Sequence, residues 1–180
     1  MKNNRLNKII LLVVILSFVF TTAASAVVFT DISKHWAKSY IERVAEKGLV
    51  TGYDDNTFRP DNNVTVLESL VMLSRLYEID DDLKDEIIEK YESVLKDMPN
   101  SKGYEWSFDY LAVDIELGVV SERSINDMFS KKTVFNAATR EEVAVLLTKA
   151  MMLDGELKKV FVLPFNDADK ISESAKQYVH

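Results

Sequence analysis

One pattern occurs twice along this sequence and limits the possible folds more than any other feature. Its members are two aromatic residues, a hydrophobic residue, a glycine and a valine, and they return at a constant offset of 70 residues. The first copy is Trp36, Tyr40, Ile41, Gly48 and Val50, and the second is Trp106, Tyr110, Leu111, Gly118 and Val120. Repeated units of this kind cannot close a core alone, so each depends on its neighbours. The sequence therefore predicts tandem units that pack on one another.

The first copy predicts a helix that begins near Ser33. Apolar residues recur every four positions in two adjacent rows, which together give one broad apolar stripe. The rows are Trp36, Tyr40 and Val44, and Ala37, Ile41 and Ala45. We expect Gly48 to end this helix in a left-handed conformation, which glycine adopts without steric cost. Turn residues from Gly52 to Pro60 then predict a loop.

A second helix is predicted from the sequence Thr65-x-x-Glu68. The threonine oxygen can accept a hydrogen bond from a first-turn N–H, while the glutamate reaches back to the cap. We expect an inner face of Leu67, Leu70, Val71, Ser74 and Tyr77. The same start returns at an offset of 74 as Thr139-Arg140-Glu141-Glu142. The apolar face predicted there is Val143, Ala144, Leu146, Leu147, Ala150 and Met151. Helices this short need tertiary partners.

Two further segments complete the chain. Residues 78–94 are predicted to be an acidic helical spacer, in which Asp80, Asp81 and Asp82 are interpreted as an N-terminal cap and not as a cation site. A third copy begins at Phe165-Asn166-Asp167, with the spacing of Phe29-Thr30-Asp31. From Ser172 to His180 we expect the start of a helix whose exposed apolar face is Ala175, Tyr178 and Val179. The predicted fold is mainly α.

The charge of the chain narrows the possible partners. The formal net charge is −7, and without residues 1–26 it is −10. We expect no nucleic-acid partner, because phosphate binding needs a clustered basic surface. An acidic polymer can bind only through locally placed arginine or lysine. The absence of cysteine excludes a disulfide framework and a thiolate nucleophile.

Residues 1–26 have the three parts of a secretory signal peptide. A basic start precedes the apolar run IILLVVILSFVF, and small residues with Ala24 and Ala26 follow it. We predict cleavage after Ala26 and no stable membrane insertion afterwards. Twelve apolar residues rise about 18 Å as a helix, which is shorter than the roughly 30 Å hydrocarbon core. An uncleaved membrane anchor is the alternative.

The combined motifs resemble the S-layer homology (SLH) domain family. They are F-x-D, HWA, G-L-V-x-G-Y-D-D-x-T-F-x-P and V-T-x-x-E, and they cover Phe29 to Tyr77 almost without gaps. The resemblance is weaker over Leu95 to Met152 and fragmentary from Phe165 onward. It implies tandem helix–loop–helix repeats: two repeats plus the start of a third, an incomplete pseudo-threefold spindle. The predicted boundaries are 27–77 for repeat 1, 95–153 for repeat 2, and 154–180 for a linker and the N-terminal part of repeat 3.

The resemblance also implies a function and a site. Members of the family bind secondary cell wall polysaccharide, often pyruvylated, in grooves between repeats, and so are held on the cell wall or S-layer. The residues that match the family's groove contacts are Arg140 with Thr139, Trp36, Trp106, Gly52, Tyr53 and Asp31. Arginine can hold a carboxylate bidentately, and an indole can stack on a sugar face. A secreted, cell-wall-binding module without cofactor or metal is therefore expected.

This sequence departs from the family pattern in each repeat. Val66 stands where the family has arginine, so the groove of repeat 1 is expected to bind weakly unless Arg59 substitutes. Repeat 2 has Glu122 and Arg123 in place of the glycine loop, and Ser174 stands near the tryptophan position of repeat 3. A working groove would combine the loop of one repeat with the arginine of another.

Several alternatives remain open at the level of sequence. Trp36 and Trp106 could serve only in core packing, and Asp31 and Asp97 could be structural hydrogen-bond acceptors. The chain could be a structural, S-layer-type protein that oligomerises through its incomplete third repeat, or a truncated product with little stable fold. An enzyme is disfavoured, because no G-x-S-x-G, H-E-x-x-H or phosphate-binding glycine loop occurs.

Overall fold

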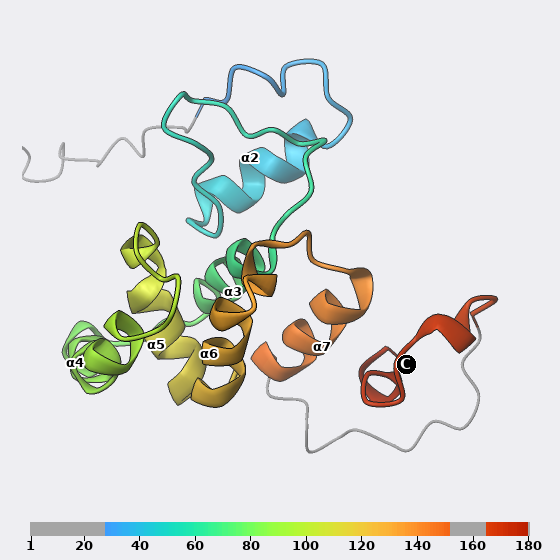
Figure 1. Cartoon of the computed structure of the whole chain (residues 1–180). Helices are drawn as coiled ribbons and strands as arrows, with labels where there is room; N and C mark the ends of the chain where they lie inside the picture. Colours follow the sequence, from blue (N-terminus) through green and yellow to red (C-terminus); the bar gives the residue numbers. More distant parts are fainter. Residues whose placement is uncertain (1–27, 152–164, 180) are drawn as a thin grey trace, which may run out of the picture.

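The protein is mainly helical, as predicted. The computed structural model describes residues 28–151 and 165–179, and within those ranges it contains α-helices and short 3-10 helices but no β-strand (Figure 1). The α-helices are α2 (Lys38–Glu46), α3 (Val66–Ser74), α4 (Asp81–Lys96), α5 (Phe108–Glu116), α6 (Glu122–Ser130) and α7 (Arg140–Ala150). The 3-10 helices are Glu105–Ser107, Thr133–Phe135, Ala168–Lys170 and Lys176–Tyr178.

The first helices of the two repeats are equivalent in length and ending. Helix α2 and helix α5 have bounds that differ by the 70-residue offset of the sequence pattern. Each is followed by a glycine in the left-handed region, Gly48 with φ +72° and Gly118 with φ +78°. The predicted helix end at Gly48 is therefore confirmed, although α2 itself begins only at Lys38.

The second helices of the two repeats begin with the same capping box. In α3 the hydroxyl of Thr65 accepts a hydrogen bond from the backbone N–H of Glu68 at 3.1 Å, and the Glu68 carboxylate accepts from the Thr65 N–H at 2.8 Å. Thr139 and Glu142 make the same pair at 3.1 and 2.8 Å before α7. Both predicted helix starts are confirmed, because each cap satisfies donors that a helix N-terminus leaves unpaired.

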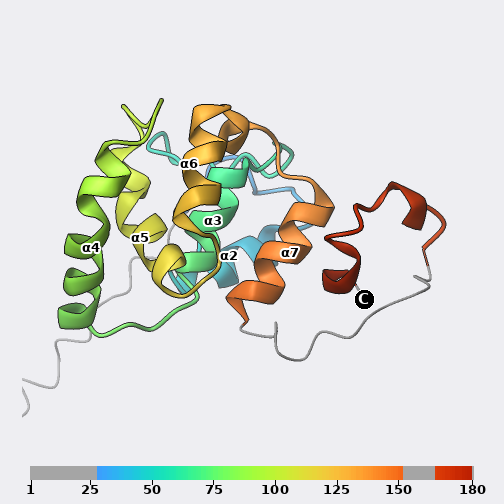
Figure 2. The same ribbon diagram turned by 60° about the horizontal axis from the view of Figure 1, so that its bottom comes forward.

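The second helices also lie side by side at their N-termini. The backbone N–H of Val66 donates to the carbonyl of Asn136 at 3.1 Å, and the N–H of Ala138 donates to the carbonyl of Val64 at 2.8 Å. Further along, the hydroxyl of Tyr77 donates to the carbonyl of Ala150 at 2.7 Å. Helices α3 and α7 thus form the junction through which the two repeats are joined (Figures 1 and 2).

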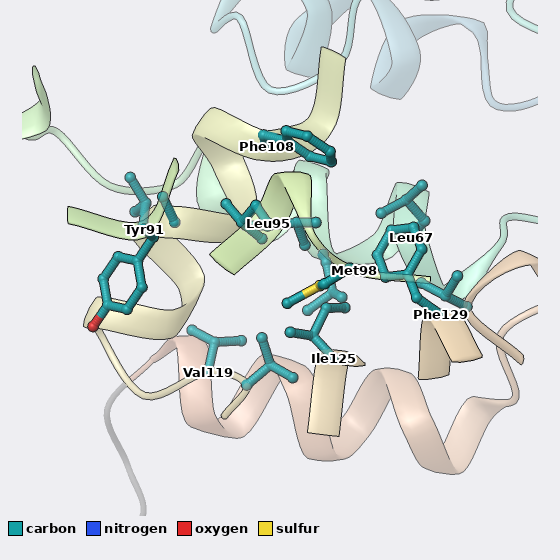
Figure 3. Packing of buried hydrophobic residues seen from close by; sticks show 14 of the residues in the cluster. Leu67, Tyr91, Leu95, Met98, Phe108, Val119, Ile125 and Phe129 are labelled. Carbon is teal, nitrogen blue, oxygen red and sulfur yellow. The ribbon is translucent and has the colours of Figure 1, made fainter. Parts of the chain in front are cut away.

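Most buried apolar residues belong to one core that both repeats share. Helices α3, α4, α5, α6 and α7 all contribute to it, and Figure 3 shows side chains such as Leu67, Leu95 and Phe129 meeting there. Helix α4, predicted as a spacer, buries Ile87, Tyr91 and Leu95 in this core, while Leu83, one turn before Ile87, is 52% exposed. The acidic helix is therefore part of the fold, and Asp80 caps it by accepting from the Asp82 N–H at 3.1 Å.

Helix α6 is an element that the sequence analysis did not predict. It occupies the position where repeat 1 has its glycine loop. Ser121 caps it by accepting from the Ser124 N–H at 3.1 Å, and Ile125 and Phe129, one turn apart, are fully buried. A helix that buries two large apolar residues thus replaces a loop, which explains why the loop motif is missing from repeat 2.

Repeat 1 has a second, smaller core of its own. Phe29, Ile32, Ile41 and Ala45 are buried there, with Phe58 and Val50 against them. This core holds α2 and the following loop together at one end of the molecule, apart from the shared core (Figure 1).

The structure corrects part of the predicted stripe on α2. Ile41 and Ala45 are buried, but Trp36 is 82% exposed and Tyr40 is 62% exposed. Only the row that faces the small core is covered, because helix α2 has a partner on one side alone.

The predicted apolar face of α7 is also only half buried. Leu146 and Ala150 are in the core, whereas Val143, Leu147 and Met151 are 39%, 41% and 57% exposed. At the C-terminus, the helix predicted from Ser172 is wrong within residues 172–179, where only the 3-10 helix Lys176–Tyr178 forms. Its predicted exposed face is also wrong, since Ala175 is 3% exposed and Tyr178 and Val179 are half-buried.

The predicted signal peptide and the 154–164 linker lie outside the described residues. Within the ranges 28–151 and 165–179, no helix combines the length and the apolar character that a membrane span requires.

Candidate functional site

A groove of about 640 Å³ lies where repeat 1 meets repeat 2. One wall is the loop after α2, the floor is helix α3, and Trp106 of the second repeat stands at the edge. The side chains that give the groove its chemical character are Tyr53, Arg59, Glu68, Arg75 and Trp106. Every lining residue except Trp106 belongs to repeat 1, so the second repeat contributes one side chain to the groove.

The loop wall is held by a close approach at Gly52. This glycine has φ +69°, and a Cβ built on it would lie 2.3 Å from the Phe29 ring and 2.7 Å from the Thr57 carbonyl oxygen. The next residue donates from its N–H to the same Thr57 carbonyl at 2.9 Å. Glycine is required here by space as well as by conformation.

The carboxylate of Asp31 fixes the far end of the loop. It accepts hydrogen bonds from the backbone N–H groups of Phe58 at 2.9 Å and Arg59 at 2.6 Å. These bonds, led by that from Phe58, lower the pKa of Asp31. Asp31 thus acts as a structural acceptor that sets the position of Arg59, which has a left-handed φ of +57°.

The Arg59 side chain lies over the ring of Tyr53. The centre of its guanidinium is 3.9 Å from the ring centroid, and its Nη2 donates to the Asp55 carboxylate at 2.9 Å. Hydrogen bonds from Thr57, then the bond from Arg59, lower the pKa of Asp55 to about 2. The Tyr53 hydroxyl donates to Glu68 at 3.2 Å, and burial, followed by the nearby Glu68, raises the pKa of Tyr53. The Arg59 guanidinium is thus held over the Tyr53 ring on the loop wall.

Arg75 connects the two repeats at the floor of the groove. Its guanidinium lies over the ring of Tyr110 at 4.9 Å and donates to the Tyr110 hydroxyl at 3.3 Å. It also donates to the Thr51 hydroxyl at 3.4 Å. Among the described residues, no carboxylate oxygen lies within 4 Å of this guanidinium, in contrast to that of Arg59. Arg75 therefore presents a charge that no acid of the described chain neutralises.

The groove brings together three of the seven residues predicted for the site. Gly52, Tyr53 and Trp106 line it, and Trp106 is 53% exposed. Trp36, Asp31, Thr139 and Arg140 do not line it. Arg140 is exposed at the start of α7, and Thr139 forms its cap.

Sequence reasoning missed Arg75 and considered Arg59 only as a substitute. No motif marks Arg75, because its role depends on Thr51 and Tyr110, which lie 24 and 35 residues away. Val66, which stands at the family's arginine position, is 4% exposed and belongs to the shared core. An arginine there would lose solvation in that core unless the helix shifted.

Comparisons with known proteins find the family similarity in the first repeat. Residues 28–65 match the S-layer homology domain family, a stretch that includes α2, the loop wall and the cap of α3. The cellulosome-anchoring protein of Acetivibrio thermocellus is 44% identical over 48 residues, which is 27% of this chain and 11% of that protein. Outer membrane protein SlpA of Thermus thermophilus is 38% identical over 58 residues, 31% of this chain and 6% of that protein.

A longer similarity covers most of the chain. Exoglucanase XynX of Acetivibrio thermocellus is 27% identical over 156 residues, which is 86% of this chain and 13% of that protein. The chain thus spans only a small part of the length of each of these relatives. The similarity to the S-layer homology domain family thus lies in residues 28–65, and the relatives include a protein named for anchoring.

Proposed function

We propose that this protein is a non-catalytic module that binds the cell wall from outside the membrane and attaches to secondary cell wall polysaccharide. The observation that carries the proposal is the groove that the Gly52–Arg59 loop and helix α3 line together with Trp106 of the second repeat. The S-layer homology match over residues 28–65 supports it, as do relatives named for anchoring and for the cell surface.

The chemistry of the groove suits a carbohydrate. Sugars present flat apolar faces that stack on aromatic rings and hydroxyls that need donors and acceptors, and the groove offers Trp106 and Tyr53 for the first. Arg59, Arg75 and the amides of Asn62 and Asn63 supply donors, while Glu68 supplies an acceptor. A pyruvylated or otherwise carboxylated sugar would add a charge-assisted bond to an arginine.

We assign no catalytic step to the module. Relatives with glycosidase names share with this chain only a minor part of their length, 13% for the exoglucanase and 7% for an amylopullulanase of Thermoanaerobacterium thermosulfurigenes. Their hydrolytic activity is therefore attributed to other parts of those proteins.

Binding to purified sacculi tests the proposed function. The protein without residues 1–26 is incubated with wall sacculi before and after chemical removal of the secondary polymer, and the bound fraction is measured by sedimentation. The proposal predicts binding to intact sacculi and its loss on stripped ones. Equal binding to both preparations would contradict it.

Two arginine variants test which part of the molecule holds the ligand. We expect Arg59→Ala to weaken binding about tenfold, because it removes a charge-assisted contact from the groove. The family resemblance instead predicts that Arg140 is the main ligand contact, so Arg140→Ala is the matched variant. The affinity of both variants for soluble wall polysaccharide is measured. A larger loss in Arg140→Ala would move the site to the start of α7.

A second candidate function is assembly with other copies of the chain. The observation that favours it is the row of exposed apolar residues on α7, Val143, Leu147 and Met151. At the 74-residue offset these correspond to Ser69, Leu73 and Tyr77 of α3, which are buried or half-buried; Ser69 is only 4% exposed, and Tyr77 bonds to α7 itself. Among the described residues, the same face is thus covered in one repeat and exposed in the other, which is a suitable surface for a second copy.

A further inference from the structure

A second cavity, of about 320 Å³, adjoins the groove and shares Thr51 and Arg75 with it. Its other walls come from the end of α2, the end of α3, the first turns of α4 and the exposed side of Tyr110 in α5. Because Arg75 and Thr51 line both spaces, the two cavities are neighbours on the surface.

Helix α4, which is not part of the repeated pattern, supplies two charged residues to this cavity. Asp81 and Lys84, on its first turns, line the space, although α4 lies outside the pattern that the two repeats share. The first turn of α4 is otherwise acidic, with Asp81 and Asp82. Lys84 is therefore the one cation that the acidic start of α4 contributes to the cavity lining.

The polar groups of the cavity complement a sugar residue. Arg75 and Lys84 donate, Asp81 accepts, and the hydroxyl of Tyr110 can do both. Among the described residues, neither the Lys84 ammonium nor the Arg75 guanidinium has a carboxylate oxygen within 4 Å. Both cations therefore keep donors for a ligand, and Tyr110 holds the Arg75 guanidinium in place at 4.9 Å from its ring.

We propose that this cavity is a second subsite, which takes the sugar residue that follows the one held in the groove. Arg75 contacts both residues, and Lys84 with Asp81 contacts only the second. The proposal rests on the proposed function, since it assumes that the groove binds wall polysaccharide. It adds that the extra helix α4 lengthens the binding track, so that affinity rises with the length of the polymer.

The test is a titration of the protein with wall polysaccharide released from sacculi and separated by length. We expect the affinity of the parent protein to rise with fragment length. Lys84→Glu should remove this rise, weakening the binding of long fragments about tenfold and that of the shortest fragments by less than about twofold. An acidic residue is well tolerated in the first turns of a helix, so this variant should fold. Lys84→Gln tests the same contact without adding a negative charge.

Lys34→Glu is the matched control, because it makes the same change of charge at an exposed lysine that lines neither cavity. Unchanged binding of long fragments by Lys84→Glu and Lys84→Gln would overturn the second subsite and leave the groove as the site. An equal loss in Lys34→Glu would also overturn it, since the effect would then be one of net charge. A parent protein that binds no fragment would overturn the proposed function and the second subsite together.

Discussion

Asp114 is a buried carboxylic acid. It is 0% exposed in helix α5, and neither of its carboxylate oxygens has a hydrogen-bond partner among the described residues. Burial raises its pKa to about 8, from an ordinary value of 3.8. At the 70-residue offset its counterpart in the first repeat is Val44, so an ionisable group stands where that repeat has an apolar one.

The raised pKa predicts a stability that falls as pH rises. The folded state holds the proton more tightly than the unfolded state. The pH-dependent part of the cost of Asp114 is therefore absent below pH 4, grows between pH 4 and pH 8, and is constant above that. We expect Asp114→Val to stabilise the protein by on the order of 3 kcal/mol at pH 7 and by little at pH 4. Urea unfolding of both proteins across this pH range measures the difference. A pH-independent difference would show that Asp114 does not titrate in this window.

The steric requirement for glycine at position 52 can be tested by comparison with Gly48, which has a similar φ. Ala at position 52 meets both a left-handed φ and two atoms closer than 3 Å, whereas Ala at Gly48 meets only the φ, because nothing lies within 4 Å. We expect Gly48→Ala to cost about 1 kcal/mol and Gly52→Ala to cost about 2 kcal/mol more. Urea denaturation gives both free energies. Equal losses would mean that the Phe29 ring moves aside without cost.

At the scale of elements, the sequence predicted what is local. Both capping boxes, the glycine helix ends and the caps of α4 follow from short motifs, and all of them form. Helix α6 was not predicted, although the sequence contains its signals, the Ser121 cap and the one-turn spacing of Ile125 and Phe129. The core role of α4 was missed because nothing in its periodicity says which neighbour covers it.

The exposed face of α7 gives a prediction about assembly. If a second copy covers it, the parent protein should associate as its concentration rises, with Leu147 near the centre of the contact. Leu147→Lys should abolish this association, since a charge would be buried without a partner. Sedimentation equilibrium over a range of concentrations measures both proteins, with Leu83→Lys, an exposed leucine on α4, as the control. A parent protein that stays monomeric would remove the assembly function.

At the scale of the whole molecule, the site combines residues of two repeats, and the spacing of motifs in the sequence could not predict which residues come together. The motifs indicated Gly52, Tyr53 and Trp106 separately, but only the fold shows that the second repeat's tryptophan and the first repeat's loop line the same groove. Both arginines of the groove have roles set by residues that fold against them, Tyr53 for Arg59 and Tyr110 for Arg75. These contacts hold two arginines at the groove of a chain whose formal net charge is −7.

The two tryptophans offer the most direct test of the central claim, that the groove between the repeats binds the polysaccharide. Trp36 and Trp106 hold equivalent positions in the two repeats and are both exposed, but only Trp106 lines the groove. Calorimetric titration with soluble wall polysaccharide compares Trp106→Ala and Trp36→Ala, which make the same substitution at the two positions. We predict a loss of about tenfold in affinity for Trp106→Ala and of less than about twofold for Trp36→Ala. Equal losses, or a larger loss for Trp36→Ala, would contradict the claim.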